Sequence, residues 1–312
     1  MKYIIFTLTL LFSLLCHSQT FDLIPLGIYG GLDEDNLSAY IISEKDKNEF
    51  LCMDAGTIRT GIKKAIEKQS LAGSPDSLLK NNIKGYFISH GHLDHVSGMI
   101  INSPDDSPKN IYALSPVIEI LKKYYFTEGP WINFANEGNF PQLNKYYYRS
   151  FNAFDTFAID NTQLTGQIFE LSHGTPYKSS ALLVKSENQY ILYLGDTGAD
   201  RIEKSTQLKL LWKTIAPLIN QGSLKAILIE VSFPNSQPEN LLFGHLTPAL
   251  LYEELTHLSS YCKSGKLKNL PVIITHLKPS GTAIETIKKE LITHNVLEVS
   301  LIFPEQGKKI SL

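Results

Sequence analysis

One short segment places four potential metal ligands directly after a predicted β-strand. Residues 89–99 read SHGHLDHVSGM and contain three of the nine histidines in the chain. The preceding residues IKGYFI form an apolar run of the length and composition typical of a buried strand. Imidazole nitrogens and carboxylate oxygens are good ligands for Zn²⁺ and similar divalent ions. We therefore expect His90, His92, Asp94 and His95 to bind metal, rather than to form a polar loop with local hydrogen bonds.

Three further residues of the same types follow apolar runs later in the chain. His173 follows IFELS, Asp196 follows ILYLG and His276 follows PVIIT. Taken singly, a histidine at the end of a strand is as often a hydrogen-bonded structural residue as a ligand. A sheet that collects the C-terminal ends of its strands at one edge would bring all of these side chains into one cleft on a rigid support.

The composition is that of an ordinary globular protein. The chain has 312 residues, 43% of them hydrophobic and 19% charged, which suits one large domain or two modest ones. The 29 basic residues nearly balance the 31 acidic residues, so the charge pattern indicates neither nucleic acid nor an anionic membrane as a partner.

The N-terminus has the pattern of a secretory signal peptide. Lys2 precedes an apolar run over residues 3–15, and the small polar stretch CHSQT follows. The run is shorter than the ~18 apolar residues that a spanning helix needs. We expect residues 1–19 to be removed and residues 20–312 to form one periplasmic or secreted domain. Cys16 leaves a lipid anchor as the alternative.

Strand-like and helix-like patterns alternate in two batches, which favours an α/β fold (α+β) with two sheets packed together and covered by helices. The predicted strands are 21–30, 37–43, 49–56, 83–90, 167–174, 179–186, 190–196, 225–233 and 271–276. The predicted helices are 59–69, 247–259, 282–293 and one that starts at DHVSGMI, residues 94–100. The second and third predicted strands, 37–43 and 49–56, are separated by the charged turn EKDKN.

An aromatic-rich segment over residues 122–157 interrupts this alternation. It reads as an insertion over the cleft, with a self-packed satellite core or a homodimer contact as alternatives. Cys52 and Cys262 lie in different segments and are more typical of two separate thiols than of a disulfide.

Taken together, these segments resemble the metallo-β-lactamase superfamily. HGHLDHVSGMI is similar to the signature of the class II cyclic-nucleotide (cAMP) phosphodiesterases, and NLSAYII, MDAGT, YLGDTG, IEVSFPN, GHLTP and THLKP follow in family order. The resemblance implies a four-layer αβ/βα sandwich with two mixed sheets. It also implies two divalent ions bound by seven side chains. Zn²⁺ is the expected metal, with Mn²⁺ or Fe²⁺ as alternatives. The first ion takes His90, His92 and His173, the second takes Asp94, His95 and His276, and Asp196 bridges both.

The implied reaction is hydrolysis of a 3′,5′-cyclic nucleotide, cAMP or cGMP, to the nucleoside 5′-monophosphate. Two ions close together can share a hydroxide at neutral pH, because each lowers the pKa of bound water. That hydroxide is the expected nucleophile, and the ribose 3′ oxygen is the leaving group. Asp94 is counted among the catalytic residues as well as the ligands.

The leaving oxygen needs a proton, and His245 in GHLTP is the candidate acid and substrate contact. Glu230 ends an apolar run and can orient His245, as a similar pair does in the related tRNA 3′-processing endonucleases; a structural salt link is the alternative. Thr247 can donate to a phosphate oxygen, and Asp54 can support a ligand histidine.

Other functions remain open at this point. The same metal platform supports thioester, lactone and β-lactam hydrolysis and RNA cleavage, so the fold alone does not choose among them. Asp196 argues against the familiar β-lactamases, which usually have cysteine there, and a signal peptide without a basic surface argues against RNA processing. A secreted metal- or nucleotide-binding module without catalysis is the alternative outside enzymes.

Overall fold

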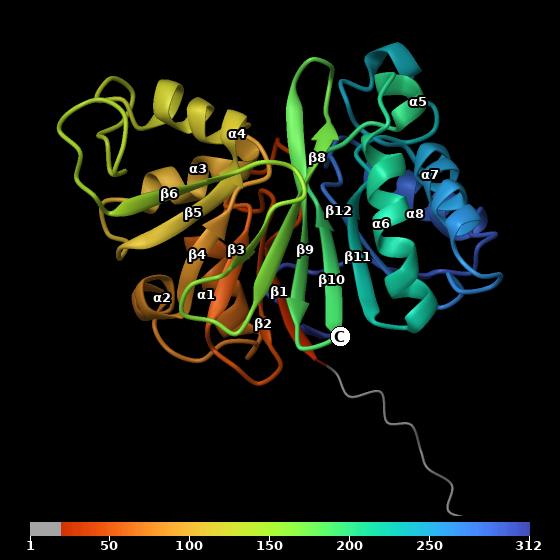
Figure 1. Cartoon of the computed structure of the whole chain (residues 1–312), viewed down its shortest axis with the longest axis horizontal. Helices are drawn as coiled ribbons and strands as arrows, with labels where there is room; N and C mark the ends of the chain where they lie inside the picture. Colours follow the sequence, from red (N-terminus) through yellow and green to blue (C-terminus); the bar gives the residue numbers. More distant parts are fainter. Residues whose placement is uncertain (1–19) are drawn as a thin grey trace, which may run out of the picture.

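Two sheets of seven strands each form the centre of the structure, a computed structural model that describes residues 20–312 (Figure 1). The predicted signal peptide and Cys16 lie outside the described residues. In spatial order the first sheet contains β14 (Ile310–Ser311), β1 (Phe21–Gly27), β2 (Ala39–Glu44), β3 (Phe50–Met53), β4 (Ile83–Phe87), β5 (Lys109–Leu114) and β6 (Tyr146–Phe151).

The second sheet comes from the later half of the chain. In spatial order it contains β13 (Ser300–Ile302), β12 (Pro271–Thr275), β11 (Leu224–Glu230), β10 (Gln189–Leu194), β9 (Lys178–Ser186), β8 (Thr165–Ser172) and β7 (Thr156–Ala158). Both sheets are mixed. The pairs β1–β2, β2–β3, β8–β9 and β9–β10 are antiparallel, whereas β3 to β6 and β10 to β13 run parallel.

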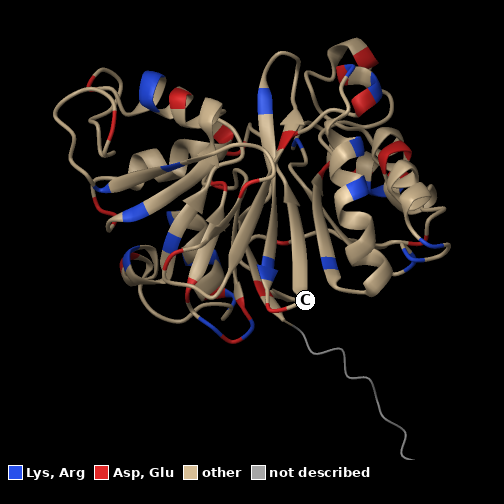
Figure 2. Cartoon of the chain, viewed as in Figure 1, with Lys and Arg blue, Asp and Glu red and all other residues tan. Residues whose placement is uncertain are grey.

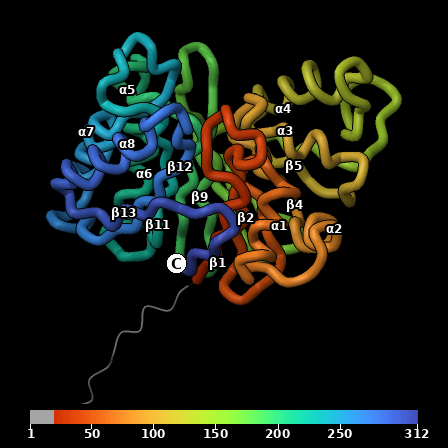
Figure 3. Tube along the Cα trace, turned by 180° about the vertical axis from the view of Figure 1, so that it is seen from behind, coloured from red at the N-terminus to blue at the C-terminus, as the bar shows by residue number. Residues whose placement is uncertain are grey.

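Helices cover the outer face of each sheet (Figures 1 and 3). On the first sheet these are α1 (Arg59–Glu67), α2 (Pro75–Ser77), η1 (Leu78–Asn82), α3 (Leu93–Asn102), α4 (Ser115–Ile120) and η2 (Leu121–Tyr125). On the second they are α5 (Asp200–Glu203), α6 (Gln207–Gln221), η3 (Glu239–Leu241), α7 (Pro248–Tyr261) and α8 (Ala283–Thr293).

Side chains that alternate along the strands of the second sheet belong to two different hydrophobic cores. On β9, Leu182 and Val184 belong to the cluster that contains the first sheet, whereas Leu183 packs with Trp212 of α6 and Leu251 of α7. Successive residues of a strand face opposite sides of the sheet, so one side chain in two faces the other sheet and the next faces the helices. The expected four layers, helix–sheet–sheet–helix, are confirmed.

Helix α6 is absent from the sequence predictions. Its buried stripe includes Leu208, Leu211, Trp212 and Ile215, but Pro217 lies inside the helix and interrupts a helical reading of the sequence. The helix ends at Gly222, whose φ of 75° is left-handed and suits glycine at this position.

Part of the aromatic segment belongs to the first sheet and to its core. Residues 146–151 form β6, which pairs in parallel with β5 at the edge of the first sheet, and Tyr146 and Phe126 are buried in the core. The intervening loop lies at the far end of the first sheet (Figure 1).

Charged residues of both signs and two unpaired cysteines are distributed over the described residues. Basic and acidic residues are interspersed over both halves of the chain (Figure 2). Cys52 and Cys262 are free thiols. None of the helices within residues 20–312 combines the length and the apolar character that crossing a bilayer requires.

Candidate active site

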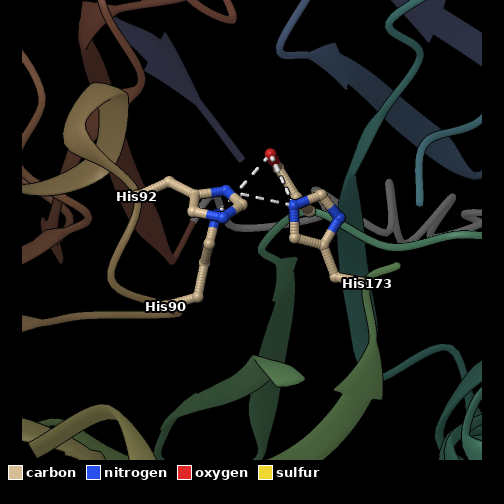
Figure 4. A group of neighbouring side chains, drawn as sticks. His90, His92 and His173 are labelled. Atoms are coloured by element: carbon tan, nitrogen blue, oxygen red, sulfur yellow. Dashed lines mark hydrogen bonds and ion pairs between the residues drawn. The ribbon is translucent and has the colours of Figure 1, made fainter. Parts of the chain in front are cut away.

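The predicted ligands lie at the C-terminal ends of strands from both sheets. His90 and His92 follow β4, and α3 begins at Leu93, so that Asp94 and His95 lie in its first turn. The three later residues also follow strands: His173 comes after β8, Asp196 after β10 and His276 after β12. Figure 4 shows His92 and His173 turned toward one another from opposite sides, with His90 beside them.

These side chains form two adjoining groups. One ligand atom from each of His90, His92, His173 and Asp196 lies within 4.8 Å of the others, and the same holds for Asp94, His95 and His276. The Oδ2 atom of Asp196 lies 3.3 Å from Nε2 of His95 and 3.1 Å from Nε2 of His276. Asp196 therefore belongs to the first group and contacts the second. The structure brings all seven predicted residues together.

Two buried nitrogens show that a cation fits here. The Nε2 atoms of His90 and His95 are buried, and neither has a hydrogen-bond partner in the described part of the chain. Leaving such an atom unsatisfied costs about 1–3 kcal/mol. A divalent ion such as Zn²⁺, which accepts nitrogen and carboxylate ligands, would satisfy both atoms.

The histidines of the first group are uncharged at neutral pH because burial lowers the pKa of each ring. Burial lowers the pKa of His90 well below its usual value, and burial together with the neighbouring His173 lowers the pKa of His92 to about 4. Burial also lowers the pKa of His173. Unprotonated imidazoles have the free lone pair that a metal ion needs.

Opposite charges stabilise one another in and around the second group. Burial disfavours a charge on His95, but Asp196, Asp54 and Asp94 together raise its pKa well above the usual value. Burial alone would raise the pKa of Asp94, yet His95 and His276 hold it well below the usual value. A metal cation that replaced the extra proton of His95 would keep this charge balance.

Asp54 is the anchor of this region in the first sheet. Its Oδ2 atom accepts hydrogen bonds from Nδ1 of His95 at 2.7 Å, from the Ser89 hydroxyl at 2.7 Å and from the Tyr193 hydroxyl at 2.5 Å. Asp54 has a φ of 54° and His276 a φ of 56°, both in the left-handed region. Such backbone costs about 1–3 kcal/mol per residue and is typical of functional sites.

Glu230 and His245 form a buried pair beside the second group. Nδ1 of His245 lies 2.7 Å from Oε1 of Glu230, and the His245 ring centroid lies 5.1 Å from that of His276. Burial opposes charge on both, but each partner outweighs it: the pKa of Glu230 is lowered and that of His245 is raised. His245, Asp196 and His276 also approach closely enough to form a third ligand set.

Thr247 has a structural contact in addition to any role with substrate. Its Oγ1 atom accepts a hydrogen bond from the backbone N–H of Leu250 and so caps the N-terminus of α7. The hydroxyl hydrogen is not used by this bond.

Asp54 and Glu230 contact His95 and His245 as the sequence predicted, but sequence reasoning missed the other groups that hold the histidines. His173 donates from Nδ1 to the carbonyl of Gly244 at 2.8 Å. Gly244 has a φ of 81°, and a Cβ there would lie 2.2 Å from the backbone nitrogen of Gly174, so only glycine fits. The glycine directly before His245 in GHLTP is the sequence signal for the contact between His173 and Gly244.

Two tyrosines hold the turn between His90 and His92. The Tyr177 ring stacks on His92 with centroids 4.6 Å apart and planes 13° apart, and its hydroxyl accepts a hydrogen bond from Gly91 N–H at 3.2 Å. Tyr125, in the aromatic segment, donates to the Gly91 carbonyl at 2.7 Å. The start of that segment therefore contacts the site.

Comparison with known proteins identifies the family. The chain matches the family model of the class-II cAMP phosphodiesterases over residues 20–299. It is 41% identical over 321 residues to the 3′,5′-cyclic-nucleotide phosphodiesterase of Aliivibrio fischeri, which covers 98% of this chain and 97% of that protein.

Solved structures agree on the fold. Unliganded yeast PDE1 superposes with a TM-score of 0.83 at 24% identity, over 95% of this chain and 100% of that chain. The metallo-beta-lactamase fold protein YhfI from Bacillus subtilis superposes with a TM-score of 0.62 at 15% identity, over 94% of this chain and 99% of that chain. The resemblance read from the sequence is confirmed: the chain belongs to the class-II cAMP phosphodiesterase family.

Proposed function

We propose that the protein hydrolyses 3′,5′-cyclic nucleotides to nucleoside 5′-monophosphates at a site that holds two divalent ions. The observation that carries the proposal is the pair of ligand groups joined by Asp196, with the Glu230–His245 pair beside them. The relative from Aliivibrio fischeri is named for this activity, and the family match covers most of the chain.

The residues divide between the two ions by proximity. His90, His92 and His173 would hold one ion, Asp94, His95 and His276 the other, and Asp196 both. We propose Zn²⁺, because five of the seven ligands are imidazoles. Such ions supply a nucleophile at neutral pH by lowering the pKa of water, and they withdraw charge from phosphate oxygens.

We assign to His245 the delivery of a proton to the leaving 3′ oxygen. Glu230 accepts from Nδ1 of His245, so we assign the proton there and leave Nε2 as the atom that faces the substrate. The raised pKa of His245, caused by Glu230 against the effect of burial, keeps the doubly protonated ring available as an acid. The Thr247 hydroxyl hydrogen can donate to a phosphate oxygen.

A substrate panel tests the proposal. Purified protein loaded with Zn²⁺ is given cAMP, cGMP, a thioester, a lactone and a β-lactam, and the products are separated by chromatography. We expect 5′-AMP or 5′-GMP, no 3′-monophosphate, and loss of turnover after chelation or in Asp196→Asn. Turnover of another class alone, or metal binding without hydrolysis of any substrate, would contradict the proposal and favour another hydrolase or a binding module.

We also propose that residues 1–19 direct export, on the sequence pattern alone. Cell fractionation with N-terminal sequencing tests this. A mature chain that starts near Thr20 outside the cytoplasm is expected, whereas a lipid-modified Cys16 in the membrane fraction would support the alternative anchor.

A further inference from the structure

We propose that Ser232 and Ser89 are positioning residues. The hydroxyl of each serine donates to a buried carboxylate and accepts a hydrogen bond from one metal-ligating histidine. Ser232 links Glu230 to His276, and Ser89 links Asp54 to His90. The inference rests on the proposed function for the identity of the metal ligands. It adds that each serine controls the affinity of a different metal site.

The Ser232 link follows from the number of hydrogens available. The Ser232 hydroxyl oxygen lies 2.6 Å from Oε2 of Glu230 and 2.9 Å from Nδ1 of His276. The hydroxyl oxygen also lies 3.2 Å from the His276 carbonyl oxygen and 3.2 Å from Nδ1 of His245. A hydroxyl has one hydrogen, and we assign it to Glu230, because the charged carboxylate is the nearest acceptor. Nδ1 of His276 must then carry a hydrogen and donate it to Ser232.

In the neutral ring that a metal ion requires, this assignment leaves Nε2 of His276 without a hydrogen. That atom lies 3.1 Å from Oδ2 of Asp94 and 3.1 Å from Oδ2 of Asp196, inside the second ligand group. The serine thereby selects the nitrogen that can bind the ion, because the two ring nitrogens of a neutral imidazole cannot both be acceptors.

Ser89 repeats the arrangement in the first sheet. Its hydroxyl oxygen lies 2.7 Å from Oδ2 of Asp54 and 3.0 Å from Nδ1 of His90. By the same argument His90 donates from Nδ1, and its Nε2 atom is the buried nitrogen that lacks a hydrogen-bond partner among the described residues. Ser89 is fixed in turn by its backbone N–H, which donates to Oδ1 of Asp54 at 2.7 Å.

Each carboxylate therefore holds one histidine directly and a second one through a serine. Asp54 contacts His95 directly, and Glu230 contacts His245 directly. The serine-linked histidines belong to different ions, because His90 lies in the first ligand group and His276 in the second. Ser89 should thus control one metal site and Ser232 the other.

Metal titration of single variants tests this division. Metal-free protein is titrated with Zn²⁺ against a competing chelator, and two stepwise dissociation constants are fitted for wild type, Ser232→Ala and Ser89→Ala. His276→Ala and His90→Ala identify which step belongs to which ligand group. Loss of a hydrogen-bond partner of a ligand typically weakens metal affinity about 10–100-fold. We expect that loss in the His276 step for Ser232→Ala and in the His90 step for Ser89→Ala, with the other step nearly unchanged.

Ser179→Ala is the matched control. Ser179 is a buried serine at the start of β9 whose hydroxyl has no hydrogen-bond partner in the described residues, so its removal should leave both steps unchanged. The proposal would be overturned if the two single variants Ser232→Ala and Ser89→Ala weakened the same binding step, or if they weakened neither binding step. An equal effect of Ser179→Ala would also overturn it.

A second measurement does not depend on the folding of any variant. Long-range ¹H–¹⁵N spectra of the Zn²⁺-loaded wild type report which ring nitrogen carries hydrogen. We expect Nδ1–H for both His276 and His90, and Nε2–H for either ring would refute its link. Both measurements are independent of substrate, so failure of cyclic-nucleotide hydrolysis with these metal results intact would count against the proposed function alone.

Discussion

Nδ1 of His245 donates a hydrogen bond to Oε1 of Glu230 across 2.7 Å at the buried end of β11. The bond fixes the ring so that its other nitrogen is free, and the carboxylate favours the charged imidazole. This geometry suits a group that gives up a proton during the reaction, and it leads to two predictions about leaving groups and pH.

His245→Ala should affect substrates according to their need for a proton. General acid catalysis typically contributes about 10²–10⁴-fold, so the turnover of cAMP should fall by that factor. A nitrophenyl phosphodiester, whose leaving group needs no proton, should lose much less. Steady-state rates with both substrates provide the test, and an equal fall in the two would mean that His245 does not act as the acid.

Glu230→Gln should shift the pH dependence of cAMP hydrolysis. The acid works while it is protonated, so activity is lost as the pH rises through the pKa of His245. Glu230 raises that pKa, and the neutral amide removes this effect, so the alkaline limb should move to lower pH. Profiles of kcat/KM against pH check this, with the nitrophenyl substrate as control. An unchanged alkaline limb would separate His245 from the titration.

Removal of metal should abolish activity and lower the melting temperature. A ligand that binds only the folded state stabilises it by about 2.7 kcal/mol when its free concentration is 100 times Kd. Chelation should therefore lower Tm, and added Zn²⁺ should restore both Tm and hydrolysis. Scanning calorimetry with and without chelator measures the shift; full activity in excess chelator is the contrary result.

Tyr177→Leu should lower the Zn²⁺ affinity, because it removes the ring that stacks on the proposed ligand His92 with an angle of 13° between the planes. Aromatic pairs contribute about 0.5–1.5 kcal/mol beyond burial, so Zn²⁺ affinity should fall about 2- to 10-fold. Tyr177→Phe keeps the ring and loses only the bond with Gly91, and it should retain most of the affinity. If both variants bind Zn²⁺ like wild type, the stacking has no role in the site.

Asp106→Ala should destabilise the fold without touching the site. Asp106 lies 2.7 Å from the buried Lys109 ammonium and accepts from the hydroxyls of Tyr86 and Tyr146. Removal of one partner of a buried ion pair costs about 3–5 kcal/mol. The neighbouring Asp105 is exposed, and Asp105→Ala should change the free energy of unfolding by less than about 0.5 kcal/mol. Denaturant unfolding compares the two; equal stabilities would contradict the prediction.

The rule that ligands follow strands predicted most of the site. His173, Asp196 and His276 are far apart in sequence, yet each ends a strand of one sheet, so a common edge brings them together. The two-batch alternation likewise predicted two packed sheets, although β5, β6, β7, β13 and β14 were not among the predicted strands. Helix α6 was missed because Pro217 conceals its apolar stripe.

Apart from Asp54 and Glu230, the contacts that orient the histidines could not be read from the sequence. Ser232 lies in the segment IEVSFPN, but its role depends on three groups meeting at one hydroxyl. Tyr177 depends on the turn that follows β8, whose path the sequence does not specify. Such contacts arise from tertiary packing rather than from local periodicity.

The donors are divided between the two halves of the polypeptide. Four of them precede residue 96 and belong to the first sheet, whereas His173, Asp196 and His276 arrive only with the second. The first sheet itself is completed only by β14 at the C-terminus. A nascent chain that ends before residue 173 therefore has four of the seven donors and lacks Asp196. The site cannot assemble until the second half of the chain has been translated and has docked on the first.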